Sequence, residues 1–500
     1  MRRSLSDLLS GYGDLPQVPD VEVGGLQLDS RKVVAGDLFV ALKGHHSHGL
    51  RHAAQAIDNG CTGIIYDPAG AELFMKILDH GIPSVAVEGL DQKLGILADR
   101  FFDYPSQAMS VIGITGTNGK TSCSHFLAAA LGATTKAGVI GTLGWGSPGQ
   151  LGLTTHTTPD AIEVHRILHA LHFDGYHYVA MEASSHGLVQ GRLNGVHFRG
   201  ALYTNLSRDH LDYHQTMEAY LEAKLLLMDS PGLEFVVLNA EDAMATSIVQ
   251  RTREGVKVLG FCSDECQPDF DIPLLRFGSV RHQPDGVEFT VHYEGQSASI
   301  KAPVFGDFNV ENLTASLAVL LSLGLAFSEA VKALASVSAV PGRMENILIG
   351  GRSAVIDYAH TPDALASVLE SMKKHCSGML WVVFGCGGDR DRGKRAQMGA
   401  IADSLADRLV ITDDNPRSED PEGIIHAILE GVNRQNATII RDRRGAIHFA
   451  LEAAAPDDLV LVAGKGHEDS QEIGGFKYPF SDRKVVGEVL NQLQSRCNCS

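Results

Sequence analysis

The segment Gly-Ile-Thr-Gly-Thr-Asn-Gly-Lys-Thr-Ser at residues 113–122 combines the residue types of a phosphate-binding loop. Its glycines let backbone N–H groups turn inward around a phosphate, Lys120 supplies positive charge, and the Thr121 hydroxyl can hold Mg²⁺. Ile114 stands where the standard P-loop has its first glycine, so the spacing departs from that pattern. Because a strand-like run precedes the loop and a helical pattern follows it, a nucleotide site is favoured over a structural turn.

Four further side chains could act on a phosphate or a metal ion. Glu182 ends an apolar run and is a natural Mg²⁺ ligand, while Ser184 or Ser185 just beyond it could cap the next segment. His210 could ligate a metal or position a phosphate, although a solvated loop fits its segment equally well. Lys224 lies on a predicted helix and by itself is typical of a surface lysine. Arg343 follows a Pro-Gly boundary, where it could reach a phosphate or adenine, or form a hinge ion pair.

The segment Thr-Asp-Asp-Asn-Pro-Arg-Ser-Glu-Asp-Pro at residues 412–421 places both signs of charge between a predicted strand and a predicted helix. Its proline restricts the backbone. A guanidinium such as that of Arg417 can bind a carboxylate with two parallel hydrogen bonds. The residue types alone leave two interpretations open, a ligand site or a surface ion pair of Arg417 with Glu419 or Asp420.

The elements that position these residues share one feature, because each polar segment follows an apolar run that predicts a strand. In open α/β sheets, ligands bind beyond the carboxyl ends of the strands. Seven such segments therefore predict a large composite site. They are residues 116–121, 182–186, 205–210, 357–360, 387–392, 413–417 and 464–468.

Alternating predicted strands and helices indicate an α/β protein with largely parallel sheets. A chain of 500 residues exceeds one hydrophobic core, so about two to four domains are expected. We expect a small N-terminal α/β domain at 1–105, a central P-loop-type, mostly parallel sheet domain at 106–340, and a C-terminal Rossmann-like domain at 341–500. Residues 280–303 alternate polar and apolar and predict an antiparallel patch.

Composition narrows the class of protein. A formal net charge of −18 argues against nonspecific nucleic-acid binding, which needs an excess of Lys and Arg. The N-terminus lacks the apolar core of a secretion signal, and no apolar run reaches the ~18 residues of a membrane span. Eight cysteines show no zinc-like spacing. We expect a cytoplasmic enzyme with no nucleic-acid partner and no membrane insertion.

Together the motifs resemble the Mur ligase family, the ATP-dependent amino-acid-adding enzymes of peptidoglycan precursor synthesis. The resemblance runs from about residue 25 to residue 485 and rests on Thr-Gly-Thr-Asn-Gly-Lys-Thr, Glu-x-Ser-Ser-His, Asn-Leu-Ser-Arg-Asp-His-Leu-Asp-Tyr-His, Gly-x-Phe-Asn-Val-x-Asn, Gly-Arg-Met-Glu and Asp-Tyr-Ala-His-Thr-Pro-Asp. The later motifs Gly-Cys-Gly-Gly-Asp-Arg-Asp, Asp-Asn-Pro-Arg and Gly-Lys-Gly-His-Glu resemble the branch that adds meso-diaminopimelate to UDP-N-acetylmuramoyl-L-alanyl-D-glutamate.

The resemblance implies that the three domains bind the UDP-sugar, ATP and the incoming amino acid in that order. It implies Lys120, Glu182, His210 and Lys224 as catalytic residues, with Mg²⁺ held by Glu182, His210, Lys224 as a carbamate, and Thr121. A bare ammonium about 5 Å from Mg²⁺ would cost roughly 7 kcal/mol at an effective dielectric near 20, and carbamylation reverses that sign. The implied ATP-binding residues are Gly116, Thr117, Asn118, Gly119, Lys120, Thr121, Ser122, Asn309 and Arg343.

The resemblance also implies both remaining substrate sites. The UDP-sugar residues are Leu28, Ser30, His45, Thr157, Thr158, Ser184, Gln190 and Arg192. The diaminopimelate residues are Arg390, Asp414, Asn415, Pro416, Arg417, Gly464 and Glu468. In this interpretation Arg417 grips the far carboxylate of diaminopimelate, and Asp414 and Asn415 take its far ammonium.

The implied reaction has two steps. ATP phosphorylates the D-glutamate side-chain carboxylate, and the diaminopimelate amine then attacks the acyl phosphate. Three alternatives stay open at this point. They are a lysine-adding ligase, a folate-polyglutamating ligase, which would not be expected to need residues 1–105, and a nucleotide-binding regulator without ligase activity.

Overall fold

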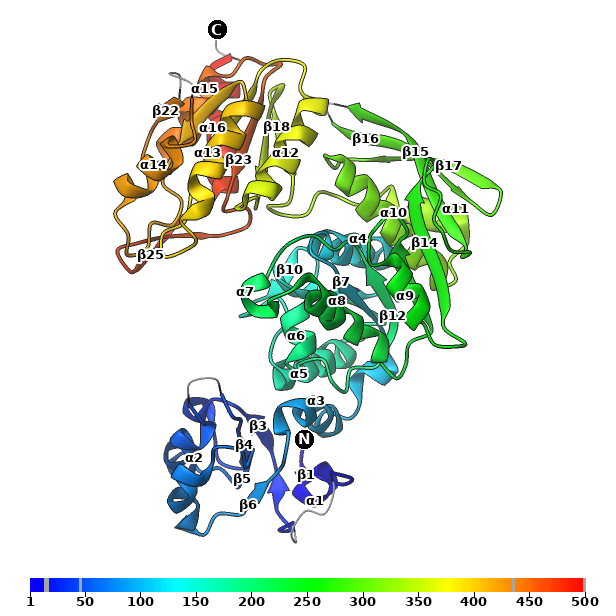
Figure 1. Cartoon of the computed structure of the whole chain (residues 1–500), viewed down its shortest axis with the longest axis vertical. Helices are drawn as coiled ribbons and strands as arrows, with labels where there is room; N and C mark the ends of the chain where they lie inside the picture. The colour runs from blue at the N-terminus through cyan, green and yellow to red at the C-terminus, as the bar shows by residue number, and fades with distance from the viewer. Residues whose placement is uncertain (13–17, 45–46, 284, 434–436, 498–500) are drawn as a thin grey trace. The chain divides into compact units, whose positions relative to one another are not determined.

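The computed structural model describes residues 1–12, 18–44, 47–283, 285–433 and 437–497 (Figure 1). The chain divides into two compact units. The first comprises Met1–Phe261, Cys266–Leu274 and Ala318–Gly324, and the second comprises Cys262–Glu265, Leu275–Leu317 and Leu325–Ser500. Each unit is described separately.

The first unit begins with a four-stranded parallel sheet in the order β3-β4-β5-β6. Successive side chains of a strand point to opposite faces, so a strand covered on both sides is apolar throughout. In β4, Leu38 and Val40 join one apolar cluster with α1 and α3, while Phe39 and Ala41 join another with α2. The elements are β1 (Arg3–Ser4), α1 (Leu5–Leu8), β2 (Glu22–Val23), β3 (Gly25–Gln27), η1 (Ser30–Lys32), β4 (Asp37–Ala41), η2 (Gly49–His52), α2 (Ala53–Asp58), β5 (Gly63–Tyr66), η3 (Glu72–His80), β6 (Ser84–Ala86), α3 (Leu90–Phe101) and η4 (Pro105–Ala108).

A second sheet follows in the first unit, with strands in the order β10-β9-β8-β11-β7-β12-β13-β14. The six strands β8, β11, β7, β12, β13 and β14 run parallel to one another. At the edge next to β8, strands β9 and β10 pair in antiparallel fashion. The strands are β7 (Ser110–Thr115), β8 (Ala137–Gly141), β9 (Gly144–Ser147), β10 (Gln150–Gly152), β11 (Tyr178–Glu182), β12 (Phe198–Tyr203), β13 (Phe235–Asn239) and β14 (Lys257–Ser263). The helices are α4 (Lys120–Gly132), α5 (Ala161–Phe173), α6 (Ser185–Val189), α7 (Leu211–His214), α8 (Met217–Leu225), η5 (Leu226–Asp229) and α9 (Ala245–Arg251).

The second unit contains an antiparallel meander and a six-stranded sheet. The meander confirms the patch predicted at residues 280–303 and consists of β15 (Leu274–Gln283), β16 (Gly286–Tyr293) and β17 (Gln296–Ala302). Two helices follow it, α10 (Asp307–Ser322) and α11 (Phe327–Leu334). The six-stranded sheet has the order β18-β19-β23-β20-β21-β22, in which only β18 is antiparallel.

Helices cover both faces of this six-stranded sheet (Figure 1). One apolar cluster joins it to α12, α13 and α14, and a second joins it to α15 and α16, so the sheet is doubly wound as predicted. Its strands are β18 (Glu345–Ile349), β19 (Arg352–Asp357), β20 (Leu380–Phe384), β21 (Arg408–Ile411), β22 (Ala437–Ile439) and β23 (Leu459–Ala463). Strands β24 (Ser470–Ile473) and β25 (Phe476–Pro479) form a separate two-stranded antiparallel sheet. The helices are α12 (Pro362–His375), α13 (Gly393–Leu405), α14 (Pro421–Leu429), α15 (Arg443–Ala453) and α16 (Asp482–Cys497).

A strand precedes each of the seven polar segments, as predicted. The helix predicted after the phosphate loop begins at Lys120, because Gly119 adopts a left-handed conformation that ends the loop. The predicted helix that carries Lys224 is α8, and it changes to 3₁₀ geometry after Leu225. The domain boundaries at 105 and 340 stay a prediction. Among the described residues, none of the helices has the length and apolarity to span a bilayer.

Candidate active site

The predicted phosphate loop joins β7 to α4. Gly116 has φ +149°, and a Cβ there would lie 1.9 Å from the Thr204 Oγ1 atom, so only glycine fits. The Lys120 Nζ atom donates to the carbonyls of Gly116 (2.8 Å) and Thr117 (2.9 Å). These bonds curl the loop around the amino end of α4, where backbone N–H groups favour an anion.

The polar segment after β12 braces this loop. The Asn118 N–H donates to the Asn205 Oδ1 atom (2.9 Å), and the Thr204 hydroxyl donates to the Asn118 carbonyl (2.6 Å). The Thr117 N–H also donates to the Asn205 carbonyl (2.8 Å). The density of polar residues after β12 therefore has a local structural reason, since two strand ends are bound together there.

Glu182 ends β11 and is 1% exposed. Its carboxylate accepts hydrogen bonds from the Thr121 hydroxyl (3.1 Å) and from the backbone N–H (2.9 Å) and hydroxyl (3.1 Å) of Thr142. The structure thus brings together Thr121 and Glu182, two of the four predicted metal ligands. Thr142 was not predicted; it follows β8, and no motif marks it.

The donor set at this point suits Mg²⁺. Hydroxyl and carboxylate oxygens are the hard ligands that Mg²⁺ prefers, and it usually keeps several waters beside one or two carboxylates. Within the described part of the chain, no three His, Cys, Asp or Glu side chains gather as a metal site. Thr121 and Glu182 therefore fit an ion completed by water and phosphate oxygens better than a cage made of protein side chains.

Lys224 is 1% exposed on α8, although the helix pattern alone predicted a surface lysine. Its Nζ atom lies 4.2 Å from the centre of the Tyr220 ring. Burial, followed by repulsion from Lys120, holds the pKa of Lys224 well below its ordinary value, although Asp209 and Asp242 act in the opposite direction. A lower pKa increases the neutral fraction of the amine, and the neutral amine, which has a free lone pair, is the form that can be carbamylated.

His210 borders the same aromatic group as Lys224. Its ring stands edge-on to His186 (5.0 Å) and to Tyr220 (6.1 Å), measured between ring centres. The Tyr220 hydroxyl lies 3.2 Å from the Thr117 Oγ1 atom, which connects this group to the phosphate loop. The remaining two predicted metal ligands, His210 and Lys224, thus share Tyr220 as a neighbour.

Two groups of predicted UDP-sugar residues occur in the first unit. Leu28 and Ser30 follow β3, and the Ser30 hydroxyl donates to the Gln55 Oε1 atom (2.8 Å). An open cleft of about 630 Å³ lies beyond the carboxyl ends of the neighbouring strands β4, β5 and β6, as expected for parallel strands. It is lined by Lys43, Asp67, Pro68, Ala69, Glu88, Gly89 and Asp91. His45 lies outside the described residues.

The other group gathers around Thr158 at the end of β11. The Thr158 hydroxyl donates to the Glu182 carbonyl (2.8 Å) and accepts from the Ser184 N–H (3.0 Å). The Arg192 guanidinium donates to the Thr158 carbonyl (2.7 Å) and to the Gln190 Oε1 atom (2.9 and 2.5 Å). Thr157 accepts from the Thr142 hydroxyl (3.0 Å). Ser184 also caps α6, as its sequence predicted.

Two predicted ATP residues belong to the second unit. Asn309 is buried on α10 and donates to the Phe305 carbonyl (2.8 Å). The Arg343 guanidinium stacks over the Tyr358 ring at 4.8 Å, which is a cation–π contact. The phosphate loop, by contrast, belongs to the first unit.

Arg417 is half-buried in the turn between β21 and α14. It has φ +54°, its Nη1 atom donates to the Gly388 carbonyl (2.8 Å), and its Nε atom lies 3.4 Å from the Glu472 carboxylate. The surface pairing with Glu419 or Asp420 is wrong, because Glu419 instead pairs with Arg395 (2.9 Å) and Asp420 caps α14. The Arg417 guanidinium is therefore held by the Gly388 carbonyl and the Glu472 carboxylate, and not by the acidic residues that follow it in the chain.

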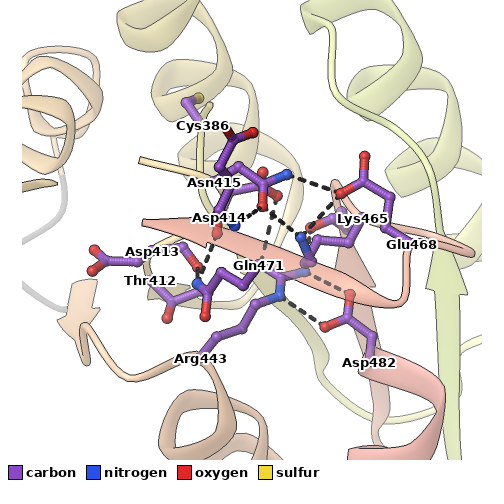
Figure 2. A network of polar contacts seen from close by, with 12 residues as sticks. Cys386, Thr412, Asp413, Asp414, Asn415, Arg443, Lys465, Glu468, Gln471 and Asp482 are labelled. Carbon is purple, nitrogen blue, oxygen red and sulfur yellow. Dashed lines mark hydrogen bonds and ion pairs between the residues drawn. The ribbon is translucent and has the colours of Figure 1, made fainter. Parts of the chain in front are cut away.

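The other predicted amino-acid residues surround this turn. Asp414 and Asn415 are buried, and Asn415 donates to the Glu468 carboxylate (2.9 Å; Figure 2). A Cβ on Gly388 would lie 1.9 Å from the Pro416 carbonyl, which explains the paired glycines after β20. Gly464 follows β23, and Arg390 is exposed in the loop after β20. The structure thus brings Asp414, Asn415, Pro416, Arg417, Gly464 and Glu468 together around the ends of β20, β21 and β23.

Three family models match the chain in order. They are "Mur ligase family, catalytic domain" at residues 22–102, "Mur ligase middle domain" at 114–320 and "Mur ligase, glutamate ligase domain" at 342–466. A curated relative from Alkalilimnicola ehrlichii is 44% identical over 495 residues, which cover 98% of this chain and 99% of the relative. The chain belongs to the Mur ligase family.

Other members of the family agree. The relative from Xylella fastidiosa strain Temecula1 is 43% identical, and the match covers 99% of this Mur ligase and 99% of the relative. The relative from Coxiella burnetii is 41% identical, and the match covers 94% of this Mur ligase and 96% of the relative. All three are named UDP-N-acetylmuramoyl-L-alanyl-D-glutamate--2,6-diaminopimelate ligase. A solved structure of that name has a TM-score of 0.72, 36% identity and 99% coverage of both chains. MurF from Acinetobacter baumannii shares the fold, with a TM-score of 0.66, 19% identity and coverage of 98% of this chain and 99% of that chain.

Proposed function

We propose that this Mur ligase adds meso-diaminopimelate to UDP-N-acetylmuramoyl-L-alanyl-D-glutamate, with ATP as co-substrate. The observation that carries the proposal is that relatives 41–44% identical over nearly the whole chain bear the name of that ligase. Neither a lysine-adding ligase nor a regulator without activity is favoured by those names. The half-buried Arg417 beside Asp414 and Glu468 supports an acceptor that carries both charges.

The first step is phosphoryl transfer. The D-glutamate side-chain carboxylate attacks the γ-phosphorus of ATP, the bond to the β–γ bridging oxygen breaks, and ADP leaves. Lys120 neutralises charge on the moving phosphoryl group, and the loop of Gly116 orients it. Thr121 and Glu182, with His210 and a carbamylated Lys224, would hold Mg²⁺, which when bound neutralises phosphate charge.

The second step is acyl transfer. A diaminopimelate amine attacks the acyl phosphate, a tetrahedral intermediate forms, and phosphate leaves as the amide bond is made. Arg417 holds the far carboxylate, and the acidic residues around it hold the far ammonium. Lysine lacks the far carboxylate and would lose the contact with Arg417, so discrimination of roughly 10⁴-fold is expected.

An ADP-release assay tests the proposal. The UDP-muramoyl dipeptide and ATP are supplied with diaminopimelate, lysine or ornithine in separate reactions, each with Mg²⁺ or with a chelator. We expect ADP release only with diaminopimelate and Mg²⁺. Equal rates with lysine would instead indicate the lysine-adding ligase, and release that is indifferent to every amino acid would indicate a regulator.

The proposal also retains the domain division at residues 105 and 340. We infer that residues 1–105 contribute Leu28, Ser30 and His45 to the UDP-sugar site, that 106–340 carry the phosphate loop, and that 341–500 bind the amino acid. The four-stranded sheet and its cleft support the first assignment. The turn of Arg417 supports the last.

A further inference from the structure

Three charged side chains with no role in the proposed reaction lie behind the amino-acid turn. Arg443 begins α15, Asp482 begins α16, and Lys465 follows β23; their exposed fractions are 1%, 0% and 0%. Removing a charge from water costs several kcal/mol unless it is paired and hydrogen-bonded. A group of such charges next to a ligand site therefore calls for a reason beyond packing.

Arg443 is held in one orientation by Asp482. Its Nε and Nη2 atoms donate to the two carboxylate oxygens of Asp482 (2.8 and 2.7 Å), and Nη2 also donates to the Ala463 carbonyl (3.0 Å). Its Nη1 atom has no hydrogen-bond partner among the described residues. That atom lies 4.0 Å from the Oδ2 atom of Asp414, which is likewise unpartnered in the described structure.

Lys465 organises the other side of the turn (Figure 2). Its Nζ atom donates to the Oδ1 atom of Asn415 (2.9 Å) and to the carboxylate of Glu468 (3.0 Å). The Oδ1 atom of Asn415 also accepts from the Glu472 N–H (3.0 Å), so both of its lone pairs are used. An ammonium needs an acceptor, and Asn415 has none left. Asp414 and Glu468 are therefore the acceptors that remain.

Two of the charge pairs are hydrogen-bonded, Arg443 with Asp482 and Lys465 with Glu468. Asp414 is 8% exposed and forms only a long ion pair with Arg443 (4.0 Å), with no hydrogen bond from either cation. Burial raises the pKa of Asp414, and Arg443 and Lys465 oppose that shift. Burial also acts to raise the pKa of Glu468, but Lys465 and Asn415 outweigh it, so the pKa of Glu468 lies below its usual range.

Other titratable groups face Asp414 as well. Glu468 and Asp482 add negative charge that raises its pKa. Tyr358, His360 and Cys386 lie at the neighbouring strand ends and interact electrostatically with it. Asp413 points away from the network (Figure 2) and pairs with Arg441 (3.3 Å). The two buried cations are thus what opposes neutralisation of Asp414 in this part of the structure.

We propose that Arg443, oriented by Asp482, and Lys465 are positioning residues that keep Asp414 and Glu468 ionised and aimed at the far ammonium of the incoming diaminopimelate. They do not touch the substrate. Asn415 links Lys465 to Glu468, because its side chain accepts a hydrogen bond from Lys465 and donates one to Glu468. Arg417 binds the far carboxylate, so the far carboxylate and the far ammonium of diaminopimelate are recognised by separate charged residues. The inference rests on the proposed function.

The test compares diaminopimelate with 2-aminopimelate, which keeps the far carboxylate but lacks the far amine. KM and kcat for both are measured from pH 6 to pH 9 in the wild type, Lys465→Met, Lys465→Arg and the double variant Arg443→Gln with Asp482→Asn. The double variant removes both members of the Arg443–Asp482 ion pair together, so neither of them is left as an unpaired buried charge. Thermal midpoints and circular dichroism establish which variants are folded.

Loss of a nearby cation raises the pKa of a carboxyl group, so protonation then abolishes ammonium binding at a higher pH. We expect Lys465→Met and the double variant to raise KM for diaminopimelate roughly tenfold to a hundredfold, with a smaller change in kcat. The preference over 2-aminopimelate should fall by a similar factor, and the acidic limb of the KM profile should move up by about one pH unit or more. Lys465→Arg should restore most of the preference.

If Arg443 and Lys465 had a purely structural role, the variants would bind both amino acids less tightly by the same factor, and the acidic limb of the KM profile would not move. That result overturns the proposal. The wild type alone provides a second test that needs no variant. Its preference for diaminopimelate over 2-aminopimelate should stay constant from pH 7 to pH 9, where the proposal keeps both carboxylates ionised, and a preference already lost in that range overturns the proposal. If the wild type releases no ADP with diaminopimelate, it is the proposed function that fails.

Discussion

At the scale of single residues, the candidate site depends on charges that the fold keeps away from water. Lys224, Glu182 and Asp414 are all buried, and each would be more stable in solvent unless neighbours compensate. Glu182 has three hydrogen-bond donors, whereas Lys224 has a lowered pKa and an aromatic neighbour. Substitutions at these positions therefore report on charge more directly than on packing.

Replacing Arg417 with alanine should lower kcat/KM with diaminopimelate by about 2–4 kcal/mol of transition-state binding. The reason is that a desolvated guanidinium would otherwise grip the far carboxylate. Arg441→Ala is the matched control, since the Arg441 side chain is about half exposed and forms ion pairs with Asp413 and Glu422. It should change kcat/KM by less than about threefold. Unchanged kinetics of Arg417→Ala would remove the assignment.

Activity should depend on carbon dioxide through Lys224. Purging CO₂ should lower the rate, and bicarbonate should restore it, because a carbamate forms reversibly on a neutral amine. Lys224→Arg should lose about 10²-fold or more of kcat and should not respond to bicarbonate, since arginine stays charged. Lys136→Arg, on an exposed lysine over Tyr176, should keep the wild-type response. Full activity of Lys224→Arg would contradict the carbamate.

At the scale of elements, helix α3 packs closely on the turn that follows α6. A Cβ on Gly95 would lie 2.0 Å from the Asn194 carbonyl oxygen, and His165 on α5 lies 3.1 Å from the same oxygen. The turn follows Gln190 and Arg192 of the predicted UDP-sugar site directly. The packing of α3 therefore bears on the position of those two side chains.

Gly95→Ala should force the turn away from α3. We expect a destabilisation of about 1–3 kcal/mol and a raised KM for the UDP-dipeptide, with KM for diaminopimelate nearly unchanged. Gly132→Ala is the control, because nothing lies within 4 Å of a Cβ at the end of α4. It should be neutral or stabilising by up to about 1 kcal/mol. Steady-state kinetics and thermal unfolding check both variants, and equal behaviour would refute the close packing.

At the scale of the whole molecule, a chain with formal net charge −18 must bind three anionic or zwitterionic substrates. The positive charge therefore has to be local, and we expect Lys120, Arg192, Arg343 and Arg417 to supply it in different parts of the chain. Long-range repulsion by the net charge is screened beyond about 8 Å at physiological ionic strength, so contacts at short range decide binding. Separate local sites predict separate effects of ligands on stability.

ATP with Mg²⁺ and the UDP-dipeptide should each raise the free energy of unfolding by mass action, by about 2.7 kcal/mol at a hundred times Kd, and the thermal midpoint should rise with it. Lys120→Ala should lose the effect of ATP and keep that of the UDP-dipeptide, whereas Arg192→Ala should do the reverse. Differential scanning fluorimetry with each ligand alone measures this. Loss of both effects in either variant would show that the two sites are not independent.

Much of the fold was predictable because its signals are local. Apolar runs such as those of β7 and β23 predicted buried strands, and polar segments beyond them predicted the ligand edge of the sheets. The phosphate loop and the turn of Arg417 were recognisable because their residues are contiguous. These features, together with the order of the motifs, are what the amino-acid sequence determined by itself.

Tertiary structure alone decided which distant residues meet. The pairing of Arg443 with Asp482, of Glu182 with Thr142, and of Arg417 with Glu472 joins residues 39, 40 and 55 positions apart. No local pattern marks such pairs, since each depends on the order of strands in a sheet. The burial of Lys224 was equally invisible, because a helix pattern shows periodicity but not which neighbours cover the helix. Charge compensation in this protein is therefore a property of the folded chain and not of its motifs.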